Sequence, residues 1–371
     1  MKKIVFFIGN MSHSGGTERV LSVVAGGLAE RGFQVTVLSL WGRGPEFFAL
    51  NKMVKIIWVE DSVGEYNIIK QLCYLTRILR EEKPDFLVDV DSILGIYSLL
   101  LKRMVSGLRW ISWEHFSCRH HFTKNALLRK FVKKLVYRYS DQMIVLTEAD
   151  MRYYCRHYKL KCGITCIGNP LPYQTEFHKQ TERPIIIAAG RLTAVKGFDL
   201  LIRSWSMLES RYPEWSVLVA GEGEDRRQLE SAAAQEGLKR IHFIGNVDPI
   251  EDLYKKAAFF VLPSRNEGFG MVLIEAMHFA LPAVSYACVS GPKEIVRDGV
   301  NGFLIEKGNV IEFASKMELF IKNEQLRRQM GEKAAKSIRR YERDKILDRW
   351  VKLLRAVYDR EESGKDRRRD C

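Results

Sequence analysis

The first half of the chain alternates short apolar runs with longer stretches in which apolar residues recur at helical spacing. The run Ile4–Ile8 predicts a buried strand, Glu18–Glu30 predicts a helix, and Val35–Leu40 predicts a second strand. A strand, a helix and a strand in this order form one parallel β-α-β unit. Further strands are predicted at residues 54–59, 86–90, 109–113, 143–146 and 164–167, and further helices at 66–82 and 125–139.

The alternation stops near the middle of the chain and then begins again. Residues 169–172 carry two prolines, which favour extended chain, and a polar stretch follows up to Arg183. A domain boundary is therefore predicted here. Beyond it, strands are predicted at residues 185–189, 216–220, 242–244, 259–262, 283–286 and 303–305, and helices at 198–210, 226–236, 249–257, 272–280 and from 311 to 358.

This order of elements predicts an α/β protein with two Rossmann-like, doubly wound domains that face a cleft. Ligands bind at the carboxyl ends of the strands in such sheets, so the cleft is the expected site. The predicted parts are an N-terminal domain at 1–168, a C-terminal domain at 169–340, a helix at 341–358 that packs back towards the N-terminal domain, and a charged, frayed tail at 359–371.

Composition and charge narrow the class of protein. The 371 residues are 46% hydrophobic and 28% charged, which is ordinary for a globular chain and excludes disorder as the main state. No apolar run approaches the roughly 18 residues of a membrane span. The net charge of +14 favours an acidic partner, such as a phosphate-bearing ligand, an anionic membrane surface or nucleic acid. The 7 cysteines are scattered, which predicts free thiols in a reducing compartment and no metal site.

A glycine pair follows the first predicted strand. Gly15 and Gly16 allow the backbone to approach a ligand closely, and the helix that begins behind them favours anions at its N-terminus. The loop lacks the spacing of a dinucleotide fingerprint or of a P-loop. A tight turn between strand and helix explains the two glycines equally well, so the pair alone is a weak signal.

Two cations stand five residues apart after the first strand of the second domain. Arg191 can form a fork of hydrogen bonds and Lys196 supplies a point charge, which together make a good clamp for a diphosphate. Solvated loop charges are the more common fate of these residue types, and the pair alone favours that alternative.

Two glutamates accompany a glycine-rich loop after the predicted strand at 259–262. Glu267 lies in the loop, and Gly268 and Gly270 leave backbone N–H groups free at a helix start, which suits a phosphate. Glu275 lies about one turn into that helix on a mostly apolar face, where the two hydroxyls of a ribose would give it partners. A capping glutamate and a salt-bridged glutamate are about as well supported for either residue alone.

Together, in this order and at strand ends, the three loops resemble those of retaining glycosyltransferases of family 4, which have the two-domain GT-B architecture. The resemblance covers residues 1–358. Within the family the chain is most similar to bacterial enzymes that extend lipid-linked oligosaccharides. The features that carry the resemblance are Glu267 and Glu275 with seven residues between them, the pair Arg191 and Lys196, the loop with Gly15 and Gly16, and the dipeptide Glu114-His115.

The resemblance implies a nucleotide-sugar donor, with UDP as the expected nucleotide, and the C-terminal domain mainly holds this donor. It also implies a lipid-linked glycan acceptor that the N-terminal domain binds. It implies no required cofactor. By the same match, Arg191 and Lys196 neutralise the diphosphate, which Gly15 and Gly16 also approach. Glu275 holds the ribose, Glu267 contacts the transferred sugar, and His115 lines the sugar pocket. The sugar and the phosphate are further supported by Gly268, Phe269, Gly270 and Met271. Without the resemblance, His115 is better explained as a structural histidine.

The resemblance also implies retention of the anomeric configuration. No carboxylate in the sequence is an evident nucleophile for a double displacement, so the expected route is a front-face reaction stabilised by preorganised cations and N–H groups. Asp89-Val90-Asp91 resembles the metal-binding Asp-x-Asp of a different glycosyltransferase architecture. Here it ends a strand of the first domain, so we interpret it as acceptor-side or structural and expect no required metal.

The basic charge is concentrated in the N-terminal half, with ten basic residues and one acidic residue between Lys102 and Arg138. Residues 123–139 predict a basic amphipathic helix. Either its apolar stripe packs on the core and its basic face is merely solvated, or the basic face docks on anionic lipid or holds the acceptor pyrophosphate. The stripe is Leu127, Leu128, Phe131, Leu135 and Val136, and the acceptor or membrane candidates are Arg129, Lys130, Lys133, Lys134 and Arg138.

The predicted location is cytoplasmic and peripheral on the inner face of the plasma membrane. A basic nucleic-acid-binding protein is an alternative, although no zinc-finger or RNA-recognition signature is present and no nucleic-acid partner is expected. A phosphorylase or epimerase with the same fold, or a catalytically silent homologue, are further alternatives.

Overall fold

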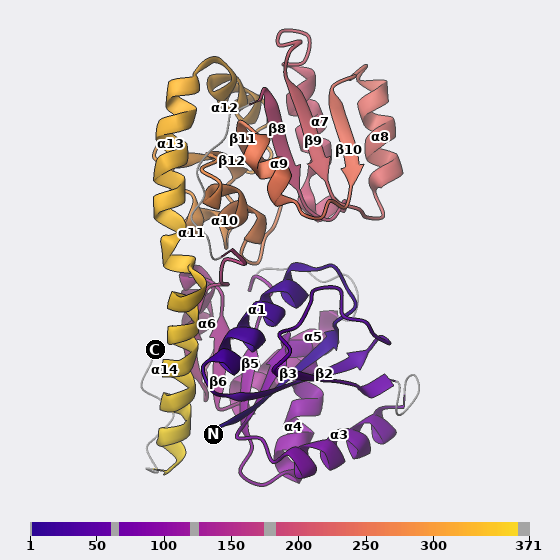
Figure 1. Cartoon of the computed structure of the whole chain (residues 1–371), viewed down its shortest axis with the longest axis vertical. Coiled ribbons are helices and arrows are strands. Elements are labelled where there is room, and N and C mark those ends of the chain that lie inside the picture. The colour runs from indigo at the N-terminus through magenta and orange to yellow at the C-terminus, as the bar shows by residue number, and fades with distance from the viewer. Residues whose placement is uncertain (1, 61–66, 119–125, 174–182, 363–371) are drawn as a thin grey trace. The chain divides into compact units, whose positions relative to one another are not determined.

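The computed structural model describes residues 2–60, 67–118, 126–173 and 183–362, and the chain divides into two compact units. Unit 1 comprises Met1–Tyr173 and Tyr341–Cys371, and unit 2 comprises Gln174–Arg340. Each unit is built on one parallel β-sheet with helices along the chain between the strands, so the predicted α/β class with two doubly wound sheets is confirmed (Figure 1).

The sheet of unit 1 has seven strands in the order β3-β2-β1-β4-β5-β6-β7, and all of its neighbours pair in parallel. The strand order reverses between β1 and β4, which is the point where doubly wound sheets bind ligands. The strands are β1 (Lys3–Asn10), β2 (Gln34–Trp41), β3 (Val54–Trp58), β4 (Phe86–Val90), β5 (Arg109–Trp113), β6 (Gln142–Val145) and β7 (Gly163–Cys166).

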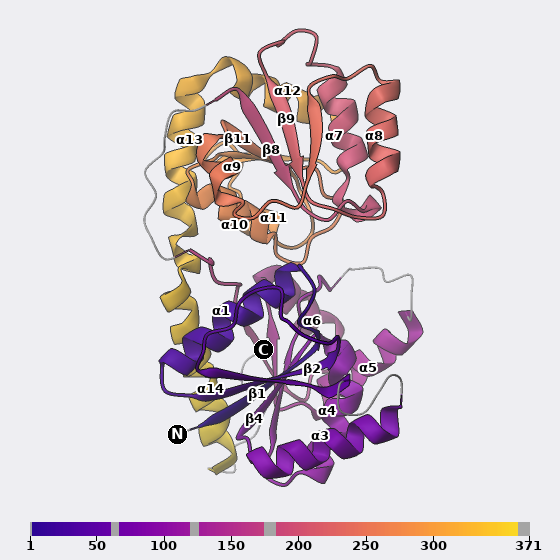
Figure 2. The same ribbon diagram turned by 45° about the vertical axis from the view of Figure 1, so that its right-hand side comes forward.

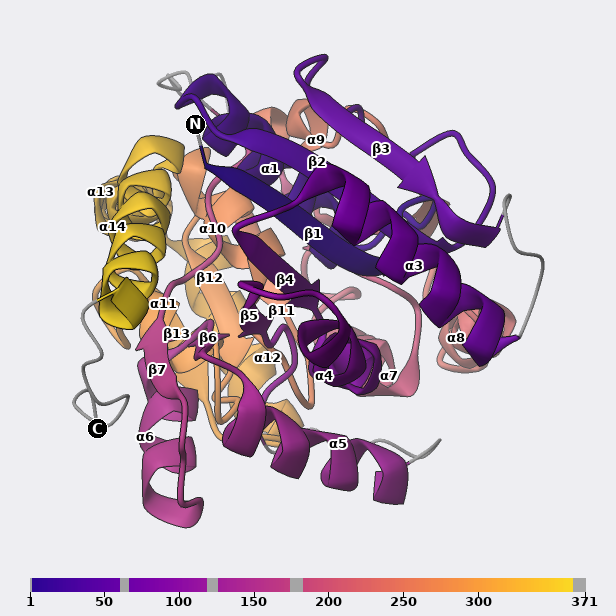
Figure 3. The ribbon, with the colours of Figure 1, turned by 90° about the horizontal axis from the view of Figure 1, so that it is seen from below.

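Helices cover both faces of this sheet, which explains why its strands are apolar runs rather than alternating ones. Right-handed crossovers place α1 on one face and α3, α4 and α5 on the other, and Figures 2 and 3 show α3 beside α4. The helices are α1 (Gly16–Glu30), α3 (Ile68–Glu82), η1 (Ser92–Leu94), α4 (Gly95–Met104), α5 (Ala126–Tyr139), α6 (Glu148–His157) and α14 (Arg343–Glu362). Of these, α4 and α6 were not predicted from the hydrophobic pattern.

The last helix, α14, belongs to the core of unit 1. Its Trp350 is fully buried, with its ring centroid 6.0 Å from that of Phe6 on β1 and 4.7 Å from that of Trp113 on β5. The helix lies so close to α1 that a Cβ on Gly27 would be 2.2 Å from Leu347 Cδ1. Unit 1 is thus completed by a segment from the far end of the chain.

The predicted start of the tail at residue 359 is wrong, because α14 continues through Glu362. Arg360 Nη1 donates to Gln142 Oε1 on β6 at 3.5 Å, which gives the end of the helix a contact with the sheet. The rest of the predicted tail, residues 363–371, lies outside the described residues.

The sheet of unit 2 has six parallel strands in the order β10-β9-β8-β11-β12-β13, and its order reverses between β8 and β11. Its strands are β8 (Ile185–Ala189), β9 (Ser216–Ala220), β10 (Ile241–Gly245), β11 (Phe259–Leu262), β12 (Ala283–Tyr286) and β13 (Gly302–Ile305).

Helices of unit 2 pack around this sheet, with α7 against α8 and α12, and α10 against α11 and α13. The helical stretch predicted from residue 311 is divided after Lys322, because the Asn323 side chain accepts from Leu326 N and starts a new helix. The helices are η2 (Ala194–Lys196), α7 (Phe198–Ser206), α8 (Arg226–Gln235), α9 (Glu251–Lys256), α10 (Met271–His278), α11 (Pro292–Ile295), α12 (Val310–Lys322), α13 (Glu324–Ser337) and η3 (Ile338–Tyr341).

Within the described part of the chain, no helix combines the length and the apolar character that a membrane crossing requires. This agrees with the sequence, which has no long apolar run.

Replacing Trp350 by alanine should destabilise unit 1 by about 3–5 kcal/mol, because it leaves a large cavity among aromatic side chains. Replacing the exposed Lys352 on the same helix by alanine should change the free energy of unfolding by less than about 0.5 kcal/mol. Chemical denaturation followed by tryptophan fluorescence measures both. Equal small effects would show that α14 is only loosely attached.

Candidate functional site

Two loops of unit 2 leave neighbouring strands at the point where the strand order reverses. One loop follows β8 and carries Arg191 and Lys196, and the other follows β11 and carries Glu267. Because β8 and β11 pair in parallel, both loops lie at the same edge of the sheet, at the carboxyl ends of the strands. This is where the general rule for doubly wound sheets places a ligand.

The two loops meet in an ion pair between Lys196 and Glu267. The Lys196 Nζ lies 2.7 Å from Glu267 Oε1, and the Ser264 hydroxyl donates to the same oxygen at 2.6 Å. The Glu267 side chain is only 7% exposed and that of Lys196 26% exposed, so the pair is largely shielded from water. Within the described chain, both of these bonds end on Oε1, which leaves Oε2 available to a ligand.

The loops are also packed backbone to backbone. Gly197 has a φ of +67°, and a Cβ at this position would lie 2.1 Å from the carbonyl oxygen of Pro263. Only glycine allows both that conformation and that approach. The glycine after Lys196 therefore brings the lysine loop into contact with the glutamate loop.

Arg191 stands at the other end of the lysine loop and is exposed. No side chain in the described ranges pairs with its guanidinium. The loop beside it is anchored, because Leu192 N donates to the Glu222 carbonyl at 2.8 Å and Asp225 N donates to the Leu192 carbonyl at 3.0 Å. A cation available to a ligand is thus held on a fixed backbone.

The start of α10 lies next in the chain after Glu267 and Gly268. Gly270 precedes the helix with a φ of +95° and no side chain caps it, so the first N–H groups point out of the helix end. Phe269 is buried, and its carbonyl packs so closely on Gly291 that a Cβ there would be 2.2 Å away. Met271 is the first residue of the helix. The N-terminus of α10 favours a negatively charged group.

Glu275 lies on α10 with 3% of its surface exposed. The Tyr254 hydroxyl donates to its Oε2 at 3.5 Å, which is a long hydrogen bond. The structure therefore brings Lys196 and Glu267 into direct contact and places Arg191 and Glu275 on the loop and the helix that flank them.

In unit 1, the predicted glycine pair begins α1. Gly15 is the N-cap, with extended backbone and no side-chain cap, and Gly16 is the first helical residue. The loop follows β1, whose neighbour β4 marks the reversal of strand order. The Glu18 carboxylate stands beside this helix start, since a Cβ on Gly15 would lie 2.4 Å from Glu18 Oε2. The predicted role of the two glycines in binding a diphosphate stays a prediction.

Glu114 and His115 follow β5 and are both buried. The Glu114 carboxylate accepts from Ser92 Oγ at 2.7 Å and lies 3.0 Å from Lys133 Nζ. Burial acts to raise the pKa of Glu114, but the Lys133 ammonium and the Ser92 hydroxyl outweigh it and lower that pKa. Burial lowers the pKa of His115 to about 4, so its imidazole is neutral at pH 7. Its Nε2 is buried without a partner among the described residues, which suits a ligand hydroxyl.

Asp91 follows β4 and adopts a φ of +96°, which is rare for a residue other than glycine. Its carboxylate lies 3.2 Å from Arg129 Nη1 on α5. Burial and the nearby Glu114 raise the pKa of Asp91 to about 6. In the described chain, no group of three or more His, Cys, Asp or Glu side chains is arranged to hold a metal ion.

The basic helix α5 is oriented differently from the expectation. Its packed side carries Val132 and Val136 together with the paired cations Arg129 and Lys133. The predicted apolar stripe is split, because the half-buried Asp91 after β4 and the buried Glu114 after β5 pair with these two cations and draw them inward. The exposed residues are Leu127, Leu128 and Phe131 with Lys130, Lys134 and Arg138.

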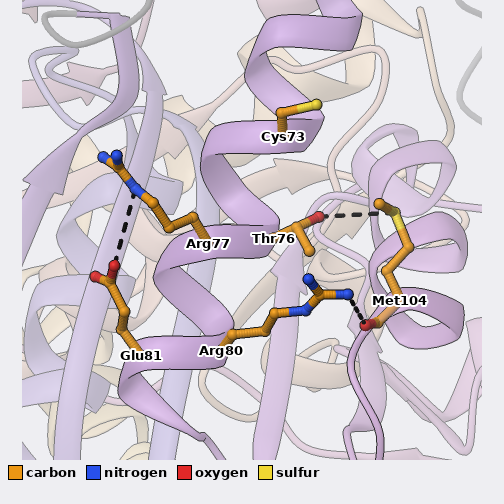
Figure 4. Close-up of a pocket in the computed structure, with 6 residues that line it drawn as sticks. All are labelled: Cys73, Thr76, Arg77, Arg80, Glu81 and Met104. Carbon is orange, nitrogen blue, oxygen red and sulfur yellow. Dashed lines mark hydrogen bonds and ion pairs between the residues drawn. The ribbon is translucent and has the colours of Figure 1, made fainter.

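A hollow of about 440 Å³ lies between α3 and α4 of unit 1, away from all the predicted site residues (Figure 4). Arg80 Nη2 donates to the Met104 carbonyl at 3.1 Å across it, and Thr76 donates to Met104 Sδ at 3.6 Å. Its lining residues are Cys73, Thr76, Arg77, Arg80, Glu81 and Met104.

Several partners of the site residues were not predicted from the sequence. Ser264 stands three residues before Glu267, so its place in the same loop is a signal that was available. Tyr254 and Ser92 lie in other elements, and only the fold brings them to Glu275 and Glu114.

Comparisons with known proteins show the family to which the chain belongs. The family model described as Glycosyltransferase Family 4 matches residues 14–174, and the model described as Glycosyl transferases group 1 matches residues 173–337. An uncharacterized glycosyltransferase of Haemophilus influenzae is 34% identical over 362 residues, which cover 95% of this chain and 100% of the relative. This chain is a glycosyltransferase of the GT-B type.

Two other similar proteins carry more specific names. The GalNAc-alpha-(1->4)-GalNAc-alpha-(1->3)-diNAcBac-PP-undecaprenol alpha-1,4-N-acetyl-D-galactosaminyltransferase of Campylobacter jejuni is 27% identical over 96% of this chain and 99% of its own. A variant of TarM from S. aureus, solved with fondaparinux, alpha-GlcNAc-glycerol and UDP, superposes with a TM-score of 0.83 at 14% identity, over 95% of this chain and 100% of its own. Membership of the glycosyltransferases favours an enzyme of this family over the alternative of a nucleic-acid-binding protein.

Asp89 on β4 should make the free energy of unfolding depend on pH. Its side chain is fully buried and accepts from Trp110 Nε1 at 2.6 Å. Burial raises the pKa of Asp89 from 3.8 to about 7. Above pH 7 the folded glycosyltransferase holds a buried charge, and between pH 4 and 7 it holds a proton that the unfolded chain has released. Stability from this group therefore rises as the pH falls from 8 to 4.

Asp89→Asn keeps the shape and an acceptor for Trp110 but carries no charge at any pH. We expect it to raise the free energy of unfolding of unit 1 by on the order of 1–3 kcal/mol at pH 8, and by less at pH 5. Urea denaturation at the two pH values measures this difference. A variant that is less stable than wild type at pH 8 would contradict the assignment.

Proposed function

We propose that this glycosyltransferase moves a hexose or an N-acetylhexosamine from a UDP-sugar to a lipid-linked oligosaccharide, with retention of configuration, in the synthesis of a surface polysaccharide or glycan. The observation that carries the proposal is the contact of Lys196 with Glu267 at the carboxyl ends of β8 and β11. It puts a cation for a diphosphate next to a carboxylate for sugar hydroxyls.

The donor would lie along unit 2 in a fixed order. The ribose hydroxyls would bind the Glu275 carboxylate on α10. The diphosphate would take Lys196, the exposed Arg191 and the N–H groups at the start of α10. The sugar would then reach Glu267 Oε2, because Oε1 already accepts from Lys196 and Ser264.

Two features of unit 1 suit the chemistry of the same ligand. The helix start at Gly15 and Gly16 suits a phosphate, and His115 Nε2, which has no partner among the described residues, suits a hydroxyl of a sugar. His115 is suited to this as a neutral group, since burial keeps the pKa of its imidazole near 4.

The reaction would proceed on one face of the sugar. The bond from the anomeric carbon to the donor phosphate oxygen breaks, and the acceptor hydroxyl oxygen bonds to the same carbon. The leaving phosphate oxygen takes the proton of that hydroxyl, so no protein nucleophile is needed. Negative charge grows on the diphosphate, and loss of one group that stabilises such charge typically costs about 3–4 kcal/mol.

The comparisons support the substrates of the proposal. The TarM structure contains UDP, and the Campylobacter jejuni relative is named for an acceptor on PP-undecaprenol. The proposed acceptor is anchored in a membrane, so this glycosyltransferase would work at the cytoplasmic face of that membrane.

A basic face of unit 1, formed by the outward sides of α3, α4 and α5, supports this location. The helices are neighbours in the order α3, α4, α5, and the hollow of Figure 4 lies within the face. Among the described residues of these three helices, Glu81 is the one exposed carboxylate. The exposed cations are Lys70, Arg77, Arg80, Arg103, Lys130, Lys134 and Arg138, and the exposed apolar residues are Ile68, Ile69, Leu100, Met104, Leu127, Leu128 and Phe131. Cations mixed with apolar side chains suit the headgroup region of an anionic bilayer.

Calorimetric titration of UDP, GDP and ADP tests the donor site. We expect UDP to bind most tightly and Lys196→Ala to weaken its binding about tenfold to hundredfold, because a charge-assisted hydrogen bond to phosphate is lost. Lys333→Ala, at an exposed position of α13, is the matched control and should bind UDP as wild type does. A Tm within a few degrees of wild type shows that Lys196→Ala is folded. Wild-type protein that binds none of the three nucleotides would contradict the proposal.

Flotation with vesicles tests the basic face. Wild type should bind vesicles of phosphatidylglycerol and phosphatidylcholine, and binding should fall as salt rises. The triple variant K130E, K134E and R138E should lose about hundredfold in affinity, since each basic residue near an anionic surface contributes about 1 kcal/mol. A triple variant with the same charge change at exposed positions elsewhere in unit 1, K52E, K352E and R355E, should bind like wild type. Equal losses in both triples would show that only net charge matters.

A further inference from the structure

Arg265 ties the glutamate loop of unit 2 to the lysine loop by side chain and backbone. Its Nη1 and Nη2 donate to the two carboxylate oxygens of Asp199, each at 2.6 Å. The same Nη1 donates to the Ala194 carbonyl at 2.8 Å, and the Arg265 backbone N–H donates to the Val195 carbonyl at 2.8 Å. One residue thus contacts the lysine loop at three places.

These three places bracket Lys196. Ala194 and Val195 immediately precede it, and Asp199 follows it by three residues at the start of α7. Lys196 itself lies in η2, a single 3₁₀ turn, which has little stability of its own. The position of its Nζ therefore depends on what holds the turn from outside.

A simple surface salt bridge would not give this arrangement. The Arg265 and Asp199 side chains are 33% and 46% exposed, and an ordinary pair with such exposure contributes little. Here the guanidinium makes a bidentate contact with the Asp199 carboxylate and at the same time donates to the Ala194 carbonyl. Of the basic side chains, only the planar fork of arginine can do both. The hydrogen bonds from Arg265 lower the pKa of Asp199, so the pair stays charged over the working pH range.

We propose that Arg265 and Asp199 are positioning residues for the nucleotide-sugar donor, and that they hold Lys196 where it meets Glu267 and the donor diphosphate. The inference rests on the proposed function for the identity of the ligand. In this proposal neither residue touches the donor, and their effect on binding passes through Lys196. We call the contacts of Arg265 with Asp199, Ala194 and Val195 the brace. Loss of the brace should therefore weaken donor binding only while Lys196 is present.

A double-mutant cycle tests this dependence. Arg265→Gln and Asp199→Asn should each weaken UDP binding about tenfold, since small displacements of a binding group are costly. Arg265→Lys keeps the charge without the fork and should be intermediate. In a Lys196→Ala background, Arg265→Gln should change the Kd by less than about twofold. Additive losses in the double variant would overturn the proposal and leave a purely structural role.

Hydrogen exchange gives a readout that needs no nucleotide. The amides of residues 194–199 should exchange faster in Arg265→Gln than in wild type, while the strands of unit 2 stay protected. The matched control is Arg211→Gln, which breaks the ion pair between Arg211, in the turn before β9, and Glu318 on α12. Arg211 lies near the amino end of β9, at the opposite edge of the sheet from the two loops. The control variant should leave both the exchange of residues 194–199 and UDP binding unchanged.

The outcomes separate the two proposals. If wild type binds no nucleotide, the donor site itself is refuted, whatever the exchange shows. If wild type binds UDP and Lys196→Ala loses it, but both Arg265→Gln and Asp199→Asn bind like wild type, only the brace is refuted. Unchanged exchange of residues 194–199 in Arg265→Gln refutes the brace independently of any ligand.

Discussion

The proposed donor site depends on one ion pair, in which Lys196 from one loop meets Glu267 from another. Shielding these two charges from water is favourable only while each has its partner and the geometry is held. The backbone contact of Gly197 with Pro263 and the Ser264 hydroxyl on Glu267 supply that geometry. A donor diphosphate would find its cation already in place, and electrostatic catalysis requires this kind of preorganisation.

The same topology recurs in unit 1 with a different result. There the reversal of strand order lies between β1 and β4, and the acidic residues that follow β4 and β5 are neutralised from α5. Asp91 pairs with Arg129 and Glu114 with Lys133, so two cations of the basic helix are used inside the unit. The remaining cations of α5 face outward beside exposed apolar side chains. One helix thus serves both the interior polar network and the outer basic face.

The architecture followed from the hydrophobic pattern because both sheets are parallel and buried, so that each strand is a short apolar run between helices. The helices α4 and α6 escaped prediction since the first begins at Gly95 directly after a 3₁₀ turn and the second carries few apolar residues. The partners of the predicted site residues were harder still. Nothing in the sequence relates Arg265 to Asp199, because their contact depends on β8 and β11 being neighbours.

The orientation of α5 shows why a helical pattern alone was not enough. Its apolar positions predicted a packed stripe, but the carboxylates of Asp91 and Glu114, which directly follow two strands, select which side turns inward. Only the assembled sheet brings those carboxylates next to α5. The inward orientation of Arg129 and Lys133 therefore follows from ion pairs that the hydrophobic pattern does not reveal.

A crystal structure of this glycosyltransferase with UDP would test the preassembled donor site most directly. The diphosphate should lie within hydrogen-bond distance of Lys196 Nζ and the Arg191 guanidinium, with the ribose at Glu275 and the loops unchanged. Two results would contradict the account. One is a nucleotide bound elsewhere, and the other is a bound diphosphate that Lys196 does not contact because its side chain remains directed to Glu267.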